Sequence, residues 1–294
     1  MPRLALLTWI WLSFAVVHSI PYAYAIEERQ TWVWFDRYHR AFPNLKIDGH
    51  CDNTQVLILQ RAWEESKLLA KAQTGNVSGY DYDLVHKTWL GQDWNRTGKP
   101  LLAYYINHRT RSIAKNFEQL KRLYDGIIAG TQWIYWWCHD PGAHCQANKK
   151  DYSTIAESWI DKSSGIREIY HTVWCPLFFE QETLENQITR TKNNIADQVI
   201  LDNFELNSAV TMYHETFHYD NLVGYPSIKD TVFYADQCYQ LAKVIGTEKA
   251  YVNADSYTVD ALAIYIQQKF QLSSPPLPRF VIEGTKPPDL KKWE

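Results

Sequence analysis

The sequence has no strong excess of charge of either sign and, after its first 25 residues, no apolar run long enough to cross a bilayer. Its 30 Lys and Arg residues nearly balance 33 Asp and Glu residues, which gives a formal net charge of −3. Nucleic acids and anionic membranes select basic surfaces, so we expect neither as a partner. The chain also shows no internal repeat, and it is long enough to bury one large core.

The first 25 residues have the pattern of a secretory signal peptide. Arg3 gives a positive start, an apolar run covers 4–17, and Ala23-Tyr24-Ala25 fits a cleavage site. The run is shorter than a membrane-spanning helix requires, and the polar end of the chain at 286–294 excludes a lipid-anchor signal. We therefore expect a secreted, extracellular protein without a membrane partner, whose mature chain begins near residue 26.

Five cysteines in an oxidising compartment predict two disulfides and one free thiol. Spacing alone does not determine their pairing. The segment 138–145 contains two Cys and two His and could be drawn as a zinc site. However, its spacing matches no standard zinc module and secretion favours oxidised thiols, so we do not expect a metal there.

Two sequons, at Asn76 and Asn95, lie in a polar stretch at 74–100 that is rich in Gly, Asn and Asp. This composition predicts a long loop. Both asparagines are therefore candidate N-glycosylation sites if the protein passes through a eukaryotic secretory pathway.

Helical periodicity and strand-like composition together indicate the fold class. Spacing and composition predict helices at 54–71, 109–129, 182–194, 231–245 and 254–270. Runs of aromatic and β-branched residues at 132–138 and 168–179 predict strands, whereas residues 26–50 look irregular. The class expected is α+β, mainly helical with a small β-sheet.

The segment Met212–Asp220 contains the pattern His-Glu-x-x-His at His214, Glu215 and His218. On a helix, residues four apart lie on one face, so both imidazoles can bind one zinc ion. Glu215 can then reach a water on that ion and act as general base in peptide hydrolysis. Asn207 or Ser208 can cap the start of this helix.

A zinc site of this kind needs a third protein ligand, and no histidine follows His218. The nearby downstream acids are Asp220, Asp230 and Asp236. Asp220 would have to fold back from the same helix, and Asp236 lies inside the next predicted helix. Asp230 is favoured because the loop before it contains Gly224 and Pro226, which let the chain turn back under the metal.

Three motifs in this order resemble the deuterolysin-type fungal zinc metallopeptidases, the aspzincins. After the His-Glu helix, Asp230 is followed by Phe233-Tyr234 and by Cys238-Tyr-Gln-Leu-Ala. The box Asn253-Ala-Asp-Ser-Tyr257 matches the one that opens the family's last helix, and Cys175-Pro-Leu-Phe-Phe179 is similar to an upstream family segment. The likeness covers about 130–270, and it implies a mainly helical, zincin-like catalytic domain.

The resemblance implies that His214, His218 and Asp230 hold one Zn²⁺ ion and that Glu215 is the general base. The family Tyr three residues past the Asp is Phe233 here, so its neighbour Tyr234 becomes the candidate catalytic hydroxyl.

The same likeness makes Asp255 and Tyr257 candidate substrate-binding residues, with helix capping as the alternative for the box acid. A second family acid is replaced by Thr258, so we do not expect strict Lys specificity. The family's bridges suggest the pairs Cys51–Cys138 and Cys145–Cys175, with a local Cys138–Cys145 bridge as the alternative.

The expected function is a secreted zinc endopeptidase that acts on polypeptides as a monomer. The alternative is a catalytically weak or inactive zinc-binding, surface-interaction protein on the same scaffold. The expected organisation is a leader at 1–25, a helical region at 26–130, a catalytic domain at 131–272 and a Pro-rich extended tail at 273–294. The region 26–130 is either a pro-region or a part of the catalytic domain.

Overall fold

The computed structural model describes residues 32–33, 44–95, 103–127, 132–146, 154–162, 168–220, 222–224 and 227–289. The predicted signal peptide lies outside these residues. The strands are β1 (Trp32–Val33), β2 (Leu45–Asp48), β3 (Trp133–Trp137), β4 (Ala156–Asp161) and β5 (Ile169–Trp174). The helices are α3 (Asn53–Thr74), α4 (Tyr82–Trp89), α5 (Ala103–Tyr124), α6 (Pro176–Glu180), α7 (Leu184–Thr191), α8 (Ile195–Gln198), α9 (Ser208–Thr216), α10 (Tyr234–Gln240), α11 (Thr247–Ala250), α12 (Ala254–Phe270) and α13 (Arg279–Glu283). Shorter turns are η1 (His144–Gln146), η2 (Leu201–Phe204) and the π-helical η3 (Leu241–Ile245).

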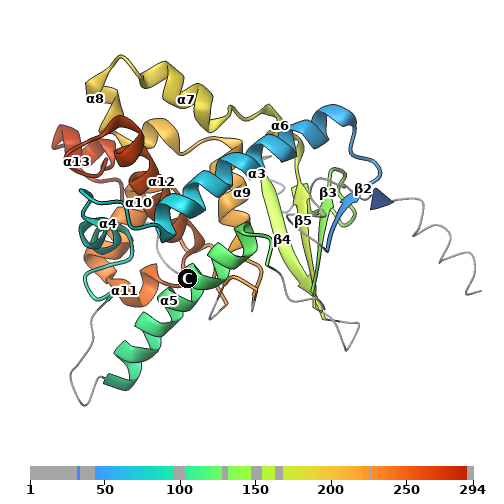
Figure 1. Cartoon of the computed structure of the whole chain (residues 1–294), viewed down its shortest axis with the longest axis horizontal. Helices are drawn as coiled ribbons and strands as arrows, with labels where there is room; N and C mark the ends of the chain where they lie inside the picture. The colour runs from blue at the N-terminus through green and yellow to red at the C-terminus, as the bar shows by residue number, and fades with distance from the viewer. Residues whose placement is uncertain are drawn as a thin grey trace, which may run out of the picture.

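The strands form one sheet in the order β1-β2-β3-β5-β4. The three inner strands run parallel, while β1 and β4 run antiparallel to their neighbours at the two edges (Figure 1). Ile47 pairs with Trp136, so the carboxyl ends of β2 and β3 lie side by side. This small sheet beside many helices confirms the predicted α+β class.

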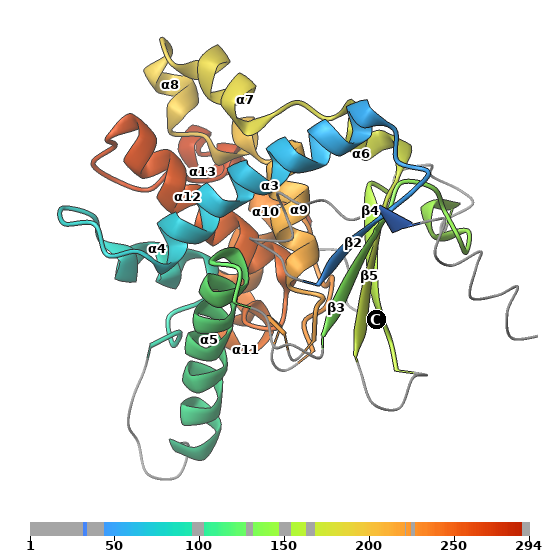
Figure 2. The same ribbon diagram turned by 45° about the vertical axis from the view of Figure 1, so that its right-hand side comes forward.

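Three helices, α3, α9 and α12, form the centre of the helical part. Figures 1 and 2 show α9 between the sheet and α12, with α3 crossing close to both. Their contacts are strongly aromatic: Trp63 of α3 stacks on Tyr124 at 4.1 Å between ring centroids, and Phe217 stacks on Tyr257 at 4.7 Å. Fully burying such a ring stabilises the fold by about 2–3 kcal/mol, so this packing fixes α9 firmly.

The described part of the region 26–130 belongs to the same core as the rest of the chain. Leu45 and Ile47 of β2 are buried in the cluster that also contains residues of α9 and α12. The two disulfides are Cys51–Cys138 and Cys145–Cys175, and Cys238 is free and buried. The pairing implied by the family resemblance is therefore confirmed. The described residues of the range 44–127 therefore pack in the same core as the rest of the described chain.

Several elements differ from the sequence prediction. The predicted loop at 74–100 contains α4, whose N-terminus is capped by Asp81 through a hydrogen bond from the Leu84 N–H group at 2.9 Å. The strands β2 and β4 were not predicted, because four to six residues are too few to show a period and their pairing partners are distant in sequence. The predicted strand at 168–179 ends at Trp174, since Pro176 starts α6.

The Pro-rich tail docks onto the helical part instead of lying free on the surface. Its described portion ends at 289, and Pro275 and Pro276 are buried. Leu277 exchanges backbone hydrogen bonds with Val199 and Leu201, and α13 follows.

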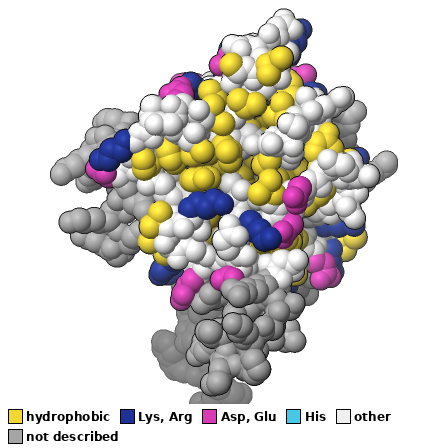
Figure 3. Space-filling model, turned by 90° about the vertical axis from the view of Figure 1, so that its left-hand side faces the viewer, with side chains coloured by type: hydrophobic (Ala, Val, Ile, Leu, Met, Phe, Trp, Pro, Cys, Tyr) yellow, Lys and Arg dark blue, Asp and Glu magenta, His cyan; other side chains and the backbone are white. Residues whose placement is uncertain are grey.

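Two further observations concern the surface. Figure 3 shows a broad area of apolar side chains, interrupted by a few charged ones, on the face that lies at the left of Figure 1. Among the described helices, none combines the length and the apolar character that crossing a bilayer requires.

Candidate metal centre

The two histidines of the His-Glu-x-x-His pattern lie at the carboxyl end of α9. Asn207 caps the helix by accepting a hydrogen bond from the Val210 N–H group at 3.0 Å. The helix ends at Thr216, and the following turn is tighter: the His218 N–H group donates to the Glu215 carbonyl at 3.2 Å. This turn keeps both rings on one side, and the Nε2 atoms of His214 and His218 are 3.1 Å apart.

Asp230 reaches the two rings because the segment around it is held by the start of α12. Lys229 forms a β-bridge with Asn253. The Oδ1 atom of Asn253 accepts hydrogen bonds from the N–H groups of Thr231 and Val232, at 2.8 and 2.9 Å. These contacts fix the backbone on both sides of Asp230, so its carboxylate is placed by tertiary structure and not by its own loop.

Three donor atoms converge as the sequence predicts. Asp230 Oδ1 lies 3.0 Å from Nε2 of His214 and 3.0 Å from Nε2 of His218. Tetrahedral zinc binds nitrogen and oxygen at about 2.0–2.2 Å, which separates its donors by about 3.3–3.5 Å. Two imidazoles and a carboxylate with this spacing fit one divalent ion after a small adjustment. The group contains three ligands, so a fourth position is left for water or substrate.

Asp255 contacts the back of the first imidazole. Its Oδ1 atom lies 2.5 Å from Nδ1 of His214, and its Oδ2 atom accepts a hydrogen bond from the Tyr234 N–H group at 2.9 Å. Burial lowers the pKa of His214, but the carboxylates of Asp255 and Asp230 outweigh it and raise that pKa well above its ordinary value. A carboxylate at Nδ1 fixes the ring and keeps Nε2 pointing to the other ligands. Asp255 is thus a positioning residue for His214.

Glu215 supplies a buried carboxylate next to the three ligands. Its side chain is almost inaccessible, and Oε2 has no hydrogen-bond partner among the described residues. Burial raises the pKa of Glu215, and the nearby imidazoles oppose this only in part. A buried carboxylate oxygen without a partner is costly, so it marks a position where water or a substrate group binds.

An aromatic pair, Phe233 and Tyr234, lies beside the first imidazole. The Phe233 ring lies 6.1 Å from the His214 ring and nearly parallel to it. Tyr234 has a φ of 68°, a left-handed conformation that is rare for a bulky residue and costs about 1–3 kcal/mol. Hydrogen bonds to Asp255 and Glu205 from consecutive N–H groups hold the chain there. The Tyr234 hydroxyl forms no hydrogen bond within the described part of the chain, and its catalytic role stays a prediction.

One other predicted site residue, Tyr257, has a different place from the one expected. Tyr257 is fully buried in the core, where its hydroxyl donates to the Tyr251 carbonyl and its ring stacks on Phe217. The prediction that it contacts substrate is therefore wrong, because it faces inward from α12. Asn76 and Asn95, the candidate glycosylation sites, are both exposed.

A second group, Asp48, His50 and His139, was not predicted. These residues lie at the carboxyl ends of β2 and β3 and form another set with the donor atoms of a metal site. The sequence contains one indication of this group: His50 directly precedes Cys51, and His139 directly follows Cys138. Because these two cysteines form a disulfide, that pairing brings the two histidines together.

No protein-family model matches this chain, and a search of curated proteins gives no significant match. The resemblance to aspzincins therefore depends on the sequence motifs and on their chemistry.

Proposed function

We propose that this protein is a secreted, zinc-dependent endopeptidase of the aspzincin type. The observation that carries the proposal is the convergence of His214, His218 and Asp230, with donor atoms 3.0–3.1 Å apart, next to the buried carboxylate of Glu215. A structural zinc site has no need for a buried carboxylate beside it with one oxygen, Glu215 Oε2, that has no hydrogen-bond partner among the described residues. Two disulfides and the expected leader support an extracellular location.

Each residue of the group has a defined task in peptide hydrolysis. A zinc ion in the site lowers the pKa of water to about 7 and polarises a carbonyl group. Glu215 accepts the proton of the attacking water and passes it to the leaving amine, and its raised pKa suits both steps. Asp255 holds the His214 ring in the tautomer that exposes Nε2.

The sheet offers a place for an extended substrate. β4 is an edge strand that pairs only with β5 among the described strands, and it packs against α9. An extended peptide can add to such an edge through backbone hydrogen bonds, and this mode selects side chains weakly. We therefore propose a polypeptide substrate bound along β4 with its scissile bond over the three ligands.

The second candidate function is zinc binding without turnover. Phe233 lies beside His214 where the family has a Tyr, and Phe233 has no hydroxyl group. A site that lacks a hydroxyl for the oxyanion loses about 10²–10³-fold in rate. This candidate predicts bound zinc and no measurable hydrolysis.

The decisive experiment compares the secreted full-length protein with Glu215→Gln on casein and on a peptide library. We expect hydrolysis that a chelator abolishes and zinc restores. Glu215→Gln should lose at least about 10³-fold in kcat/KM and keep its zinc. The matched control is Glu182→Gln, because Glu182 is half-exposed and paired with Arg190. Zinc in the wild type without hydrolysis would support the second candidate, and no zinc would exclude both.

A further inference from the structure

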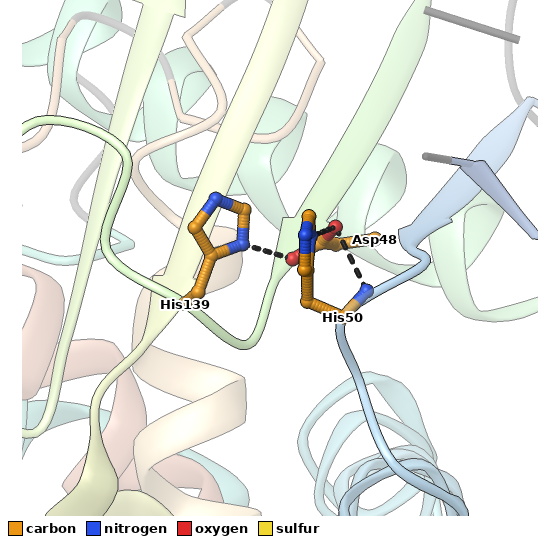
Figure 4. A group of neighbouring side chains, drawn as sticks. All are labelled: Asp48, His50 and His139. Atoms are coloured by element: carbon orange, nitrogen blue, oxygen red, sulfur yellow. Dashed lines mark hydrogen bonds and ion pairs between the residues drawn. The ribbon is translucent and has the colours of Figure 1, made fainter. Parts of the chain in front are cut away.

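The carboxyl ends of β2 and β3 carry a group that is separate from the candidate metal centre on α9. Figure 4 shows the side chains of His50 and His139 pointing at the carboxylate of Asp48 from two sides. His50 Nδ1 lies 2.9 Å from Asp48 Oδ1, and His139 Nδ1 contacts Asp48 Oδ2. The two imidazole centroids are 4.5 Å apart. No residue is shared with the group on α9.

The backbone that carries this group is fixed on both sides. After β2 the chain makes a tight turn, in which Cys51 N–H donates to the Asp48 carbonyl at 3.0 Å and His50 N–H donates to Asp48 Oδ1 at 3.1 Å. After β3, the Asp140 carboxylate accepts three backbone N–H groups of the next loop. The Cys51–Cys138 disulfide then joins the residue after His50 to the residue before His139.

The Asp48 carboxylate is buried, but its hydrogen-bond donors are open to solvent. The Asp48 side chain is fully buried, whereas the side chains of His50 and His139 are 59% and 41% exposed. Within the described residues no Lys or Arg forms an ion pair with Asp48. The donors of this carboxylate belong to His50 and His139, and because both imidazoles are open to solvent, an ion from solution can take the place of the ring protons.

We propose that Asp48, His50 and His139 form a second metal site, which takes a divalent transition-metal ion of the Zn²⁺ or Cu²⁺ class. Two imidazole nitrogens and a carboxylate oxygen are donors that suit these ions better than Ca²⁺ or Mg²⁺. The donor atoms lie within 4.8 Å of one another. The donor atoms around one ion must be closer together than 4.8 Å. Because the imidazoles of His50 and His139 are exposed, their rings can rotate toward the ion. The affinity is accordingly weaker than at the group on α9.

The chemistry of this second site is structural. Asp140, which directly follows His139, does not supply a base. Its two carboxylate oxygens accept hydrogen bonds from three backbone N–H groups of its own loop. Among the described residues, this group consists of Asp48, His50 and His139 without a further carboxylate in the role proposed for Glu215. An ion here links the ends of β2 and β3 at the point where the disulfide already joins them, and it stabilises the folded state by an amount that grows with the logarithm of its concentration above Kd.

The test is equilibrium dialysis of the metal-free full-length protein against Zn²⁺, followed by metal analysis. We expect His50→Ala and His139→Ala each to bind one equivalent less than the wild type. His144→Ala is the matched control, because His144 belongs to neither group, pairs with Glu157 and stacks on Trp159. Its metal content should equal that of the wild type. Ca²⁺ at the same concentration should not bind at Asp48, and equal retention of Ca²⁺ would contradict the proposed class of ion.

A second background separates this proposal from the peptidase proposal. In His218→Ala the group on α9 is disabled, so one equivalent of Zn²⁺ should remain and raise Tm by about 5 °C at hundredfold excess over Kd. His50→Ala/His218→Ala should bind none and show no shift. Unchanged zinc content in His50→Ala would overturn the second site and leave the peptidase intact. Equal zinc content in wild type and His218→Ala would instead count against the site on α9.

Discussion

The two histidine–aspartate groups each consist of two His and one Asp, but in one group the imidazoles are buried and in the other the carboxylate is buried. In the group on α9 the imidazoles of His214 and His218 are 10% and 13% exposed, and the carboxylate of Asp230 is 41% exposed. In the group at β2 and β3 the carboxylate of Asp48 is buried and the imidazoles are open. The first group also has supports behind its rings: Asp255 on His214, and the Ile228 carbonyl 3.3 Å from Nδ1 of His218.

This difference in burial agrees with the two proposals: a catalytic metal site at His214, His218 and Asp230, and a structural metal site at Asp48, His50 and His139. Buried rings with fixed partners hold their donor atoms close together, as a preorganised metal site requires. In the second group, the exposed imidazoles are accessible to an ion from solution and the buried carboxylate supplies a negative charge. Because these rings are exposed, the positions of their nitrogen atoms are less fixed than in the first group. A third pair, His86 and Asp260, is buried on both sides and has neither access nor a second histidine. This pair links α4 to α12.

The largest expected effect concerns the covalent link under the second group. Replacing both Cys51 and Cys138 with Ser should lower the free energy of unfolding by about 4 kcal/mol, because the loop they close spans 87 residues. It should also remove the second zinc equivalent. The matched control is the Cys145/Cys175 double Ser variant, whose loop spans 30 residues. It should cost about 3 kcal/mol and keep both equivalents, as chemical denaturation and metal analysis would show.

The next effect tests whether the third pair is structural. Asp260 is fully buried and accepts hydrogen bonds from His86 Nδ1 at 2.9 Å and from Gln73 Nε2 at 2.7 Å. Asp260→Asn leaves two donors facing one another, so we expect a loss of about 3 kcal/mol in urea unfolding without loss of zinc. Asp83→Asn, which breaks an exposed pair with Lys87, should cost less than about 1 kcal/mol. Equal costs would remove the distinction between buried and exposed pairs.

A smaller effect sharpens the role of the support behind His214. Asp255→Asn removes the charge at Nδ1, so zinc affinity at the first group should fall by about 10–100-fold in a competitive chelator titration. The second group should be unaffected. Asp236→Asn is the control, because its side chain bonds only to the neighbouring Gln237 N–H group. If both variants bind zinc alike, Asp255 does not position the ring.

The last prediction concerns the pH dependence of folding stability that arises from Glu205, close to the first group. Burial, with help from nearby acids, raises the pKa of Glu205 to about 8, against the pull of its hydrogen bond from Ala235. The folded chain therefore holds this proton more tightly than the unfolded chain, and stability falls as pH rises from about 4.5 to 8. The wild type should therefore lose stability over this range relative to Glu205→Gln, in which this side chain does not titrate. Parallel unfolding curves for the two proteins would contradict this pKa.

Sequence patterns predicted what is local. His214, Glu215 and the cap at Asn207 belong to one helix, whereas His218 follows the end of α9 in a tighter turn. The period of 254–270 matches α12 at both ends. The disulfide pairing was available only through the family resemblance. Patterns failed where a strand had too few residues to show a period, as in β2 and β4, and where α4 interrupts a stretch rich in loop residues.

The sequence by itself determined the α+β class and placed His214 and Glu215 on one helix. Its spacing of four residues predicted that the His218 imidazole lies on the same side as that of His214, and the turn after α9 keeps it there. Tertiary structure alone decided that Asn253 fixes the chain next to Asp230 and that Asp255 meets His214. It also decided that Asp48, His50 and His139 meet at all. These contacts join residues distant in the chain, and only the packing of helices and the strand order bring such residues within hydrogen-bond distance.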